Sequence, residues 1–254
     1  MIPFFRKIRK TLADDNKPLK YLRYAIGEIV LVMIGILLAL QVNNWNQNKI
    51  KLNEAISHLK SLKSDLVVDT LYFGQEKREA QKQVDDYLIF FKKVYERQNN
   101  IEEVTELINL AYPLTKYLNV QNSTFLEMVN AGKLNDLANE ELKSSIVALY
   151  RDYEIARVGN RDYNEYTASL MKGLKFNIWK FLPYNRESIF HEKYMFHDND
   201  WKFVNDYSSP NFQQFENMVT QYHGKQIDAI EMFDELKIKA SLLIKQINDE
   251  LNSH

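Results

Sequence analysis

A stretch of 19 residues, from Tyr24 to Val42, constrains this chain most, because only Glu28 and Gln41 interrupt its apolar character. As a helix it would be about 28 Å long, close to the roughly 30 Å hydrocarbon core of a bilayer. The uninterrupted apolar run, 29–40, is short enough to suit the core of a signal peptide. However, no small-x-small cleavage site follows it, and the segment before it is longer than an ordinary signal n-region. The stretch therefore predicts a retained transmembrane helix over residues 21–45, with a cleaved signal or a soluble core helix as the alternatives.

The basic residues on either side of this helix predict its orientation. Residues 4–23 contain seven Lys and Arg residues, whereas residues 43–62 contain three. Because cytoplasmic flanks are enriched in Lys and Arg, we expect residues 1–20 to form a basic cytoplasmic segment. Residues 46–254 would then lie outside the cytoplasm, in the periplasm if the cell is Gram-negative. The expected localisation is a single-pass protein of the inner membrane.

Small residues recur along one face of the predicted transmembrane helix. Gly27, Leu31, Gly35 and Ala39 are four residues apart and so form one stripe, and Glu28 borders it. Small residues let membrane helices approach closely, and a polar side chain can hydrogen-bond between them. One interpretation is therefore a helix–helix contact, with a second copy or with another membrane protein. The other is a lone anchor whose glutamate reaches the interface.

Composition limits the classes of partner, fold and site chemistry that the chain can have. The 33 Lys and Arg residues nearly balance the 34 Asp and Glu residues, so no global charge favours a nucleic acid partner. Only 7 glycines and 5 prolines occur, which favours long helices over a fold with many turns. Cysteine is absent, which excludes disulfides, thiolate metal sites and a thiol nucleophile.

Heptad spacing after Trp45 predicts a long amphipathic helix that ends near Arg97. One seam is apolar without a miss: Leu52, Leu59, Leu66, Phe73, Ala80, Tyr87 and Val94. The companion seam is mixed, with apolar Ile56, Val84 and Phe91 but polar Lys63, Thr70 and Lys77. Gly74 lies in the weaker middle, where we expect a kink or, alternatively, the turn of a helical hairpin.

A second heptad pattern predicts a helix from about Lys225 to Leu251, packed antiparallel on the first. Shorter helices are expected near 101–118, 122–131, 139–171 and 211–222. The predicted fold class is therefore all-α: an N-terminal transmembrane helix followed by an elongated extracytoplasmic bundle with long antiparallel helices.

The interval 176–207 is rich in aromatic residues and lacks clear helical periodicity. Aromatic side chains supply large contact areas and can line a groove for a ligand or partner. Trp179, Tyr184, Tyr194 and Trp201 are the residues that we would assign to such a surface. The alternative is that the aromatics close the end of the helical bundle, since aromatic side chains are buried on average.

Motifs for catalysis are missing. HEKYMFHD, which begins at His191, superficially resembles a zinc motif, but its histidines are six residues apart instead of four. There is no glycine-rich phosphate loop and no nucleophile elbow. We expect no enzymatic activity, no cofactor and no metal site.

The run YAIGEIVLVMIGILLALQVNNWN, preceded by FFRKIRK, resembles the opening signature of a family of uncharacterised membrane proteins typical of Gram-negative bacteria. The segment STFLEMVNAGKLNDLANEELKSSIVALY is similar, more loosely, to a helix-turn-helix in the soluble part of that family. The resemblance implies an N-terminal span and a helical extracytoplasmic region, and it implies no activity.

Taken together, these patterns predict a membrane-anchored, non-catalytic binding or scaffolding component of the cell envelope. The lipid bilayer is one expected partner. The alternative is a small-ligand sensor that signals through a membrane partner.

Overall fold

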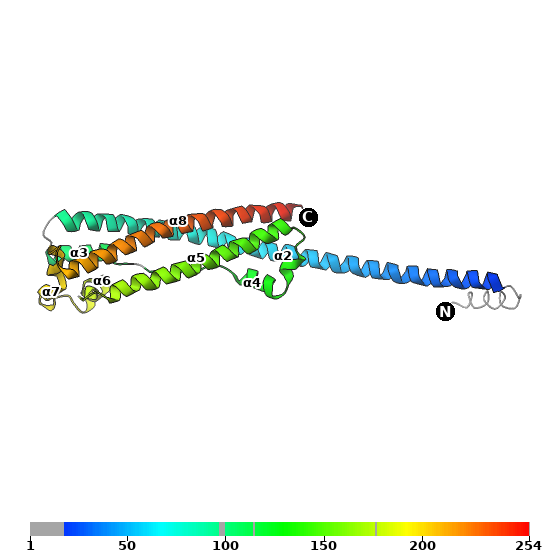
Figure 1. The fold of residues 1–254 in the computed structure, drawn as a ribbon, viewed down its shortest axis with the longest axis horizontal. Helices are drawn as coiled ribbons and strands as arrows, with labels where there is room; N and C mark the ends of the chain where they lie inside the picture. Colours follow the sequence, from blue (N-terminus) through cyan, green and yellow to red (C-terminus); the bar gives the residue numbers. More distant parts are fainter. Residues whose placement is uncertain (1–17, 97–99, 114, 176, 254) are drawn as a thin grey trace. The chain divides into compact units, whose positions relative to one another are not determined.

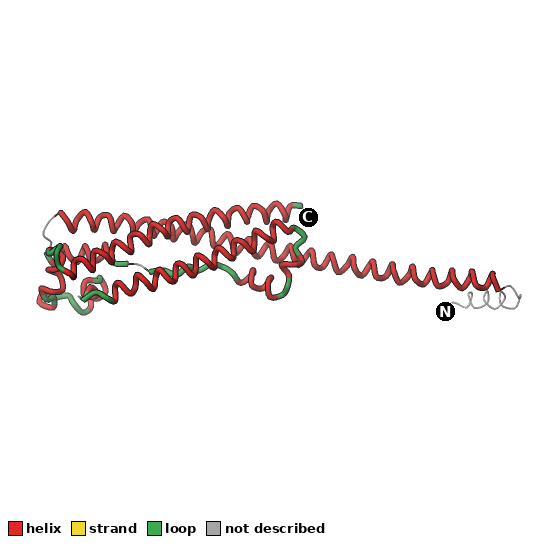
Figure 2. The backbone as a smooth tube through the Cα atoms, viewed as in Figure 1, coloured by secondary structure: helices red, strands yellow, loops and turns green. Residues whose placement is uncertain are grey.

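The computed structural model describes residues 18–96, 100–113, 115–175 and 177–253. All regular secondary structure in these ranges is helical, which confirms the all-α class (Figure 2). Two compact units divide the chain, residues 1–56 and 57–254, and helix α2 (Pro18–Glu96) contributes to both. Most of the predicted basic segment 1–20, and the side chain of Tyr184, lie outside the described residues.

The first unit contains the apolar stretch of α2. Its large apolar side chains are exposed from Leu22 to Leu52, and none of the most apolar window is buried. In the described part of the chain, this is the one helix that is long and apolar enough to cross a membrane. The coarse prediction of a candidate membrane helix near the N-terminus is therefore confirmed.

Helix α2 passes through Gly74 without a break, so the hairpin turn offered as the alternative is wrong. A Cβ at this position would lie 3.3 Å from the Nζ atom of Lys237 on the C-terminal helix. The glycine therefore makes room for a neighbouring side chain and does not end the helix.

Two heptad seams of α2 are buried in the second unit. The predicted seam is confirmed from Leu59 to Val94. The companion seam is mixed, as expected, because Val84 is buried whereas Lys63, Thr70 and Lys77 are only half-buried. The second buried seam is shifted by one residue: Leu62, Asp69, Glu76, Gln83 and Phe90. Its three central positions are polar, which is why the apolar pattern did not reveal it.

Helix α8 (Pro210–Asn252) runs antiparallel to the second-unit part of α2, as predicted (Figure 1). Lys77 pairs with Asp234, and further along α2 the ring of Phe90 meets that of Phe215. The sequence suggested two helices here, 211–222 and about 225–251, but they form one. Gly224 lies inside it, where a Cβ would meet only the hydroxyl of Tyr163 at 3.7 Å.

Helix α5 (Glu140–Lys172) is the third long helix of the second unit, and it packs antiparallel to α8 (Figure 1). Asn139 caps its first turn by accepting a hydrogen bond from the N–H of Leu142. The amide of Asn139 also donates to Glu250, near the far end of α8.

Helix α3 (Ile101–Ala111) is shorter than the predicted 101–118. Pro113 explains the early end, since a proline disfavours helical backbone in the residue before it. Residues 115–121 then run without helix to α4 (Ser123–Asn130) and the 3₁₀ turn η1 (Lys133–Asp136). Gly132 joins the last two with a left-handed φ of 68°.

Between α5 and α8 the chain forms only short helices: η2 (Ile178–Phe181), α6 (Pro183–Ser188), η3 (Lys193–Met195), α7 (Asp198–Trp201) and η4 (Lys202–Asn205). Phe181, Phe196 and Phe203 from this interval are buried in one hydrophobic cluster with residues of α2, α3 and α8. These aromatics close the end of the bundle, as the alternative interpretation of the interval 176–207 predicted.

Candidate functional site

The predicted association stripe lies on the exposed surface of α2 in the first unit. Gly27, Leu31, Gly35 and Ala39 are all exposed, and Glu28 is half-buried. A Cβ added at either glycine would meet no atom within 4 Å. The stripe is therefore accessible, and a contact with another helix through it stays a prediction.

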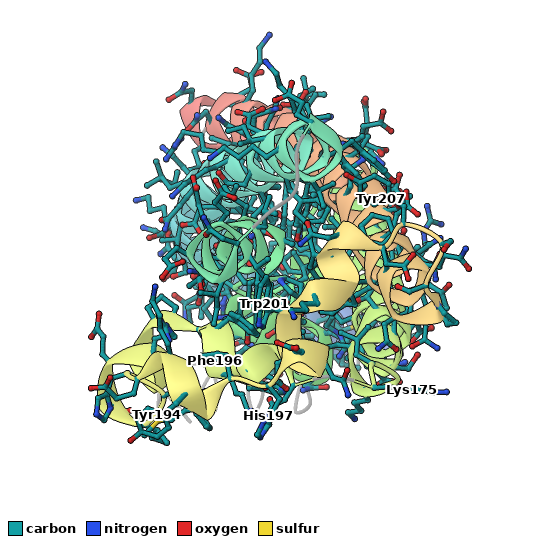
Figure 3. The ribbon with its side chains drawn as sticks, turned by 90° about the vertical axis from the view of Figure 1, so that its left-hand side faces the viewer. Lys175, Tyr194, Phe196, His197, Trp201 and Tyr207 are labelled. Carbon is teal, nitrogen blue, oxygen red and sulfur yellow. The ribbon has the colours of Figure 1, made fainter. Side chains whose placement is uncertain are left out.

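The residues of the predicted aromatic surface differ in exposure, and a shared ligand or partner surface stays a prediction. Trp179 is partly exposed and packs edge-to-face on Tyr112, whereas Tyr194 is 77% exposed. Trp201 packs against the buried cluster at the end of the bundle. Figure 3 shows Tyr194 at the periphery of this end and Trp201 nearer its middle. Trp179 and Tyr194 are thus exposed, while their buried neighbours form core.

The histidines of HEKYMFHD are both exposed. His197 precedes α7, where its backbone N–H donates to Asp200 at 2.9 Å. Among the described residues, no group of three or more His, Cys, Asp and Glu side chains is arranged to hold a metal ion.

Two adjoining pockets lie in the middle of the second unit, among α2, α5 and α8. The larger has a volume of about 270 Å³ and lies between α5 and α8. Its lining is largely apolar and includes Ala156, Gly159, Ala229 and Met232. The smaller, of about 30 Å³, lies on the α2 side. Asn160, Lys225 and Ala229 line both pockets, so the two pockets are neighbours.

Lys225 is the unusual residue of this site. It is only 5% exposed, and its Nζ atom has no hydrogen-bond partner among the described residues. The nearest compensating group is the ring of Tyr222, whose centroid lies 5.3 Å from Nζ. Because burial disfavours the charged form, the pKa of Lys225 is lowered to about 8.

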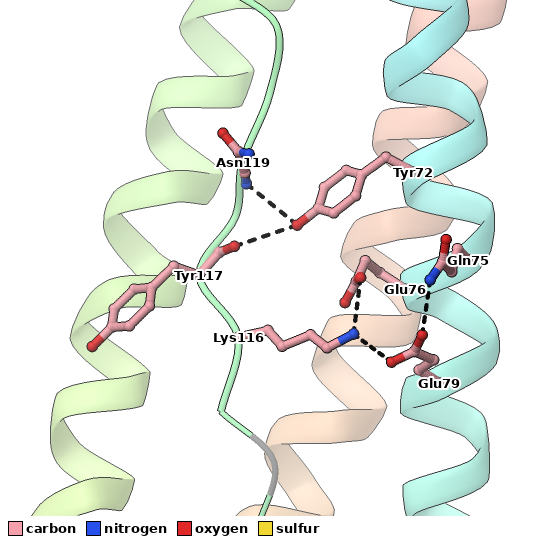
Figure 4. A network of polar contacts seen from close by, with 7 residues as sticks. All are labelled: Tyr72, Gln75, Glu76, Glu79, Lys116, Tyr117 and Asn119. Atoms are coloured by element: carbon pink, nitrogen blue, oxygen red, sulfur yellow. Dashed lines mark hydrogen bonds and ion pairs between the residues drawn. The ribbon is translucent and has the colours of Figure 1, made fainter.

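Several other polar groups at the site are already paired. Gln226 donates to Gln83 at 2.8 Å, a buried bond between α8 and α2. Lys116 contacts both Glu76, at 3.1 Å, and Glu79. Figure 4 shows Lys116 reaching from the segment 115–121 to these two carboxylates on α2. Lys116 is therefore held by two carboxylates, whereas the Nζ atom of Lys225 has no hydrogen-bond partner among the described residues.

The segment that carries Lys116 is fixed to both neighbouring helices. The hydroxyl of Tyr72 donates to the carbonyl of Tyr117 and accepts from the N–H of Asn119, each at 3.3 Å (Figure 4). On the other side, Asn160 of α5 accepts from the N–H of Leu118 at 3.1 Å. The wall of the smaller pocket is thereby held in place.

A separate buried acid lies further along α2. Asp69 is 1% exposed and accepts a 2.8 Å hydrogen bond from the N–H of Gln121. Burial raises its pKa to about 6, the hydrogen bond from Gln121 opposes that rise, and nearby Asp65 adds to it. Asp69 is covered by protein and lines neither pocket described above.

Sequence reasoning did not identify the lysine site. A signal was present, because the 3-and-4 spacing of α8 continues N-terminal to Phe233 through half-buried Ala229 and buried Lys225 to buried Tyr222 and Met218. The boundary expected between 222 and 225 divided this pattern between two helices. A lysine within a seam of this kind is the feature that would have pointed to the site.

The fold and the site define a class: an all-helical chain with one helix long and apolar enough to cross a membrane, and with a pocketed helical unit. A model of a family of unknown function, DUF6090, matches residues 28–191, and the chain belongs to that family. The match includes the apolar run 29–40 and the segment 123–150 that carried the looser resemblance. No curated protein and no solved structure matches the chain.

Proposed function

We propose that this chain is a membrane-anchored, non-catalytic binding or scaffolding component of the cell envelope. Residues 21–45 would span the inner membrane, and residues 46–254 would form the periplasmic domain. The observation that carries the proposal is the exposed apolar stretch of α2. In water, so large an exposed apolar surface is unfavourable, whereas in a bilayer the hydrocarbon core would surround it.

The proposed orientation rests on the flanking charge. Seven basic residues precede the apolar stretch within residues 4–23, and three follow it within residues 43–62. This bias favours a cytoplasmic N-terminus. The second unit would then act on the periplasmic side, as a tethered binding surface.

The accessible stripe supports association through the membrane helix. Gly27, Gly35 and Ala39 leave room for close approach of a second helix, and Glu28 lies beside them. The partner would be a second copy of the chain or another membrane protein.

Single-cysteine labelling tests the topology, because the natural chain has no cysteine. Ser253→Cys should react with a membrane-impermeant maleimide in cells whose outer membrane alone has been permeabilised. Lys10→Cys should react only after the inner membrane has also been opened. Labelling of Lys10→Cys before Ser253→Cys would reverse the orientation, and a chain that fractionates without membranes would refute the anchor.

Crosslinking in native membranes tests the stripe. Gly35→Leu and Glu28→Leu should each abolish a specific crosslinked species. Met33→Leu is the matched control, because position 33 lies about 200° around the helix from Gly35. Crosslinks that survive both stripe variants would show that the contact does not use this face.

A small-ligand sensor is the second candidate, and the pockets around Lys225 favour it. Helix α2 supplies Glu76, Ala80 and Gln83 to the smaller pocket, so a ligand there would contact the same helix that contains the apolar stretch. A membrane partner would have to receive the signal. Loss of stripe crosslinks upon ligand addition would support this candidate over a passive tether.

A further inference from the structure

Lys225 occupies a position where an apolar residue would serve the fold better. Its neighbours along the buried face of α8 are Tyr222 and Phe233, and the seam continues to Leu236 and Ala240. A buried ammonium group without an acceptor is costly to retain in a core. Residues that weaken a fold in this way concentrate where function requires them.

Lys225 borders a pocket that a ligand can enter. Lys225 lines the 270 Å³ pocket as well as the smaller one. Gly159 and Asp228 line the larger pocket and are exposed, so that pocket is open to solvent between α5 and α8. A molecule entering there would meet apolar walls and the side chain of Lys225, whose buried Nζ atom would have to turn toward it.

The charges around the pockets select among anions. Lys116 is held by Glu76 and Glu79, and Asp228 lies at the opening of the larger pocket. A ligand with one negative charge would find one cation, whereas a second negative charge would face these carboxylates. Phosphate esters and dicarboxylates are therefore disfavoured.

The volume sets the size of the ligand. A 150 Å³ apolar cavity holds benzene, which has six heavy atoms, so about 270 Å³ holds roughly ten. The alanine, glycine and methionine lining suits an apolar body.

We propose that the pocket between α5 and α8 is a binding site for a small monocarboxylic acid with an apolar body, whose carboxylate accepts a hydrogen bond from the Nζ atom of Lys225. This proposal does not depend on membrane anchoring. It can therefore be tested independently of the topology and crosslinking experiments.

Isothermal titration calorimetry on the full chain in lipid nanodiscs tests the proposal, with empty nanodiscs as the blank. The probe is 3-phenylpropanoate, which has 11 heavy atoms. The neutral comparison is 3-phenylpropanamide, which has the same shape without the charge. The wild type should bind the acid at least about tenfold more tightly than the amide, because only the acid pairs with the buried cation. The dianion 1,4-phenylenediacetate should also bind more weakly than the monoacid.

Three variants assign the binding to this site. Lys225→Met should bind the acid no better than the amide. Lys245→Met, the same change at an exposed position of α8, should behave as wild type. Gly159→Leu should lose acid binding although Lys225 is intact, because the new side chain would extend into open space in the pocket. Circular dichroism of each variant checks that the helices are retained.

Three results would overturn the proposal. The first is equal affinity of the wild type for the acid and the amide. The second is acid binding that survives in both Lys225→Met and Gly159→Leu. The third is an absence of binding to 3-phenylpropanoate and also to the smaller acids hexanoate and butanoate at millimolar concentrations.

Discussion

Asp69 and Lys225 are both buried ionisable groups, and each makes stability depend on pH in its own direction. The pKa of Asp69 is raised to about 6, so its stabilising contribution is present at low pH and is lost as pH rises through 6. The pKa of Lys225 is lowered to about 8, so its unfavourable contribution is present at neutral pH and fades between about 8 and 10.5. Near pH 7, both groups lower the stability of the folded protein.

Asp69→Asn should stabilise the protein at pH 7 by about 2 kcal/mol, because the amide keeps an oxygen for the N–H of Gln121 and carries no buried charge. The gain should vanish near pH 4, where the aspartic acid is neutral. Chemical denaturation at several pH values measures this. Asp85→Asn, at an exposed position of α2, is the control and should leave the slope between pH 4 and 7 unchanged. A slope unaltered in Asp69→Asn would contradict the assignment.

Lys225→Met should raise the free energy of unfolding of the ligand-free protein by about 2–3 kcal/mol at pH 7, because it removes the cost of burying the ammonium group. The difference from wild type should shrink as pH approaches 10. Lys245→Met, which alters no buried group, should change stability little. If Lys225→Met lowers the stability instead, then Lys225 is satisfied in the fold and the argument for a ligand weakens.

At the scale of single elements, Gly74 and Gly132 have opposite structural roles. Gly74 lies within a continuous helix, whereas Gly132 has a left-handed φ between α4 and η1. Gly74→Ala should stabilise the protein by up to about 1 kcal/mol, since the flexible end of Lys237 can move by the few tenths of an ångström required. Gly132→Ala should destabilise it by about 1–2 kcal/mol.

Thermal unfolding followed by circular dichroism compares the two alanine variants directly. The wild type and Gly159→Ala provide references, because Gly159 is helical and a Cβ there meets no atom within 4 Å. Gly159→Ala should shift the midpoint upward like Gly74→Ala. A downward shift for Gly74→Ala would show that the Lys237 side chain cannot give way.

The elements of this fold were readable from sequence where apolar periodicity was strong. The seam from Leu59 to Val94 and the seam of α8 from Phe233 to Ile247 were both predicted and are buried. The burial of polar residues in a seam could not be predicted in this way, since Asp69, Glu76 and Gln83 are buried through partners that are remote in sequence. Lys225, whose Nζ atom has no hydrogen-bond partner among the described residues, was missed because a lysine interrupts the apolar pattern of α8. Periodicity reports apolar burial, whereas buried polar groups depend on contacts that only the tertiary structure supplies.

At the scale of the whole molecule, nearly all of the buried core belongs to the second unit. Apart from Ala55, every described core residue lies between Leu59 and Ile247. A fragment comprising residues 46–254 should therefore be soluble without detergent and should keep its helices. Solubility, circular dichroism and a cooperative thermal transition measure this. Aggregation of the fragment would show that the first unit is required for folding.

The polar seam of α2 has a consequence for motion. Two long helices joined only by apolar heptads can slide past each other by seven residues and recover equivalent contacts. Here a slide of α8 by one heptad would put Phe233 or Val219 in place of Gln226 opposite Gln83, and Ile227 or Ser241 in place of Asp234 opposite Lys77. The alignment of the pair is therefore pinned by hydrogen bonds and charge. A conformational change transmitted along these helices would have to be a rotation or a bend, since translation by one heptad breaks both pairs.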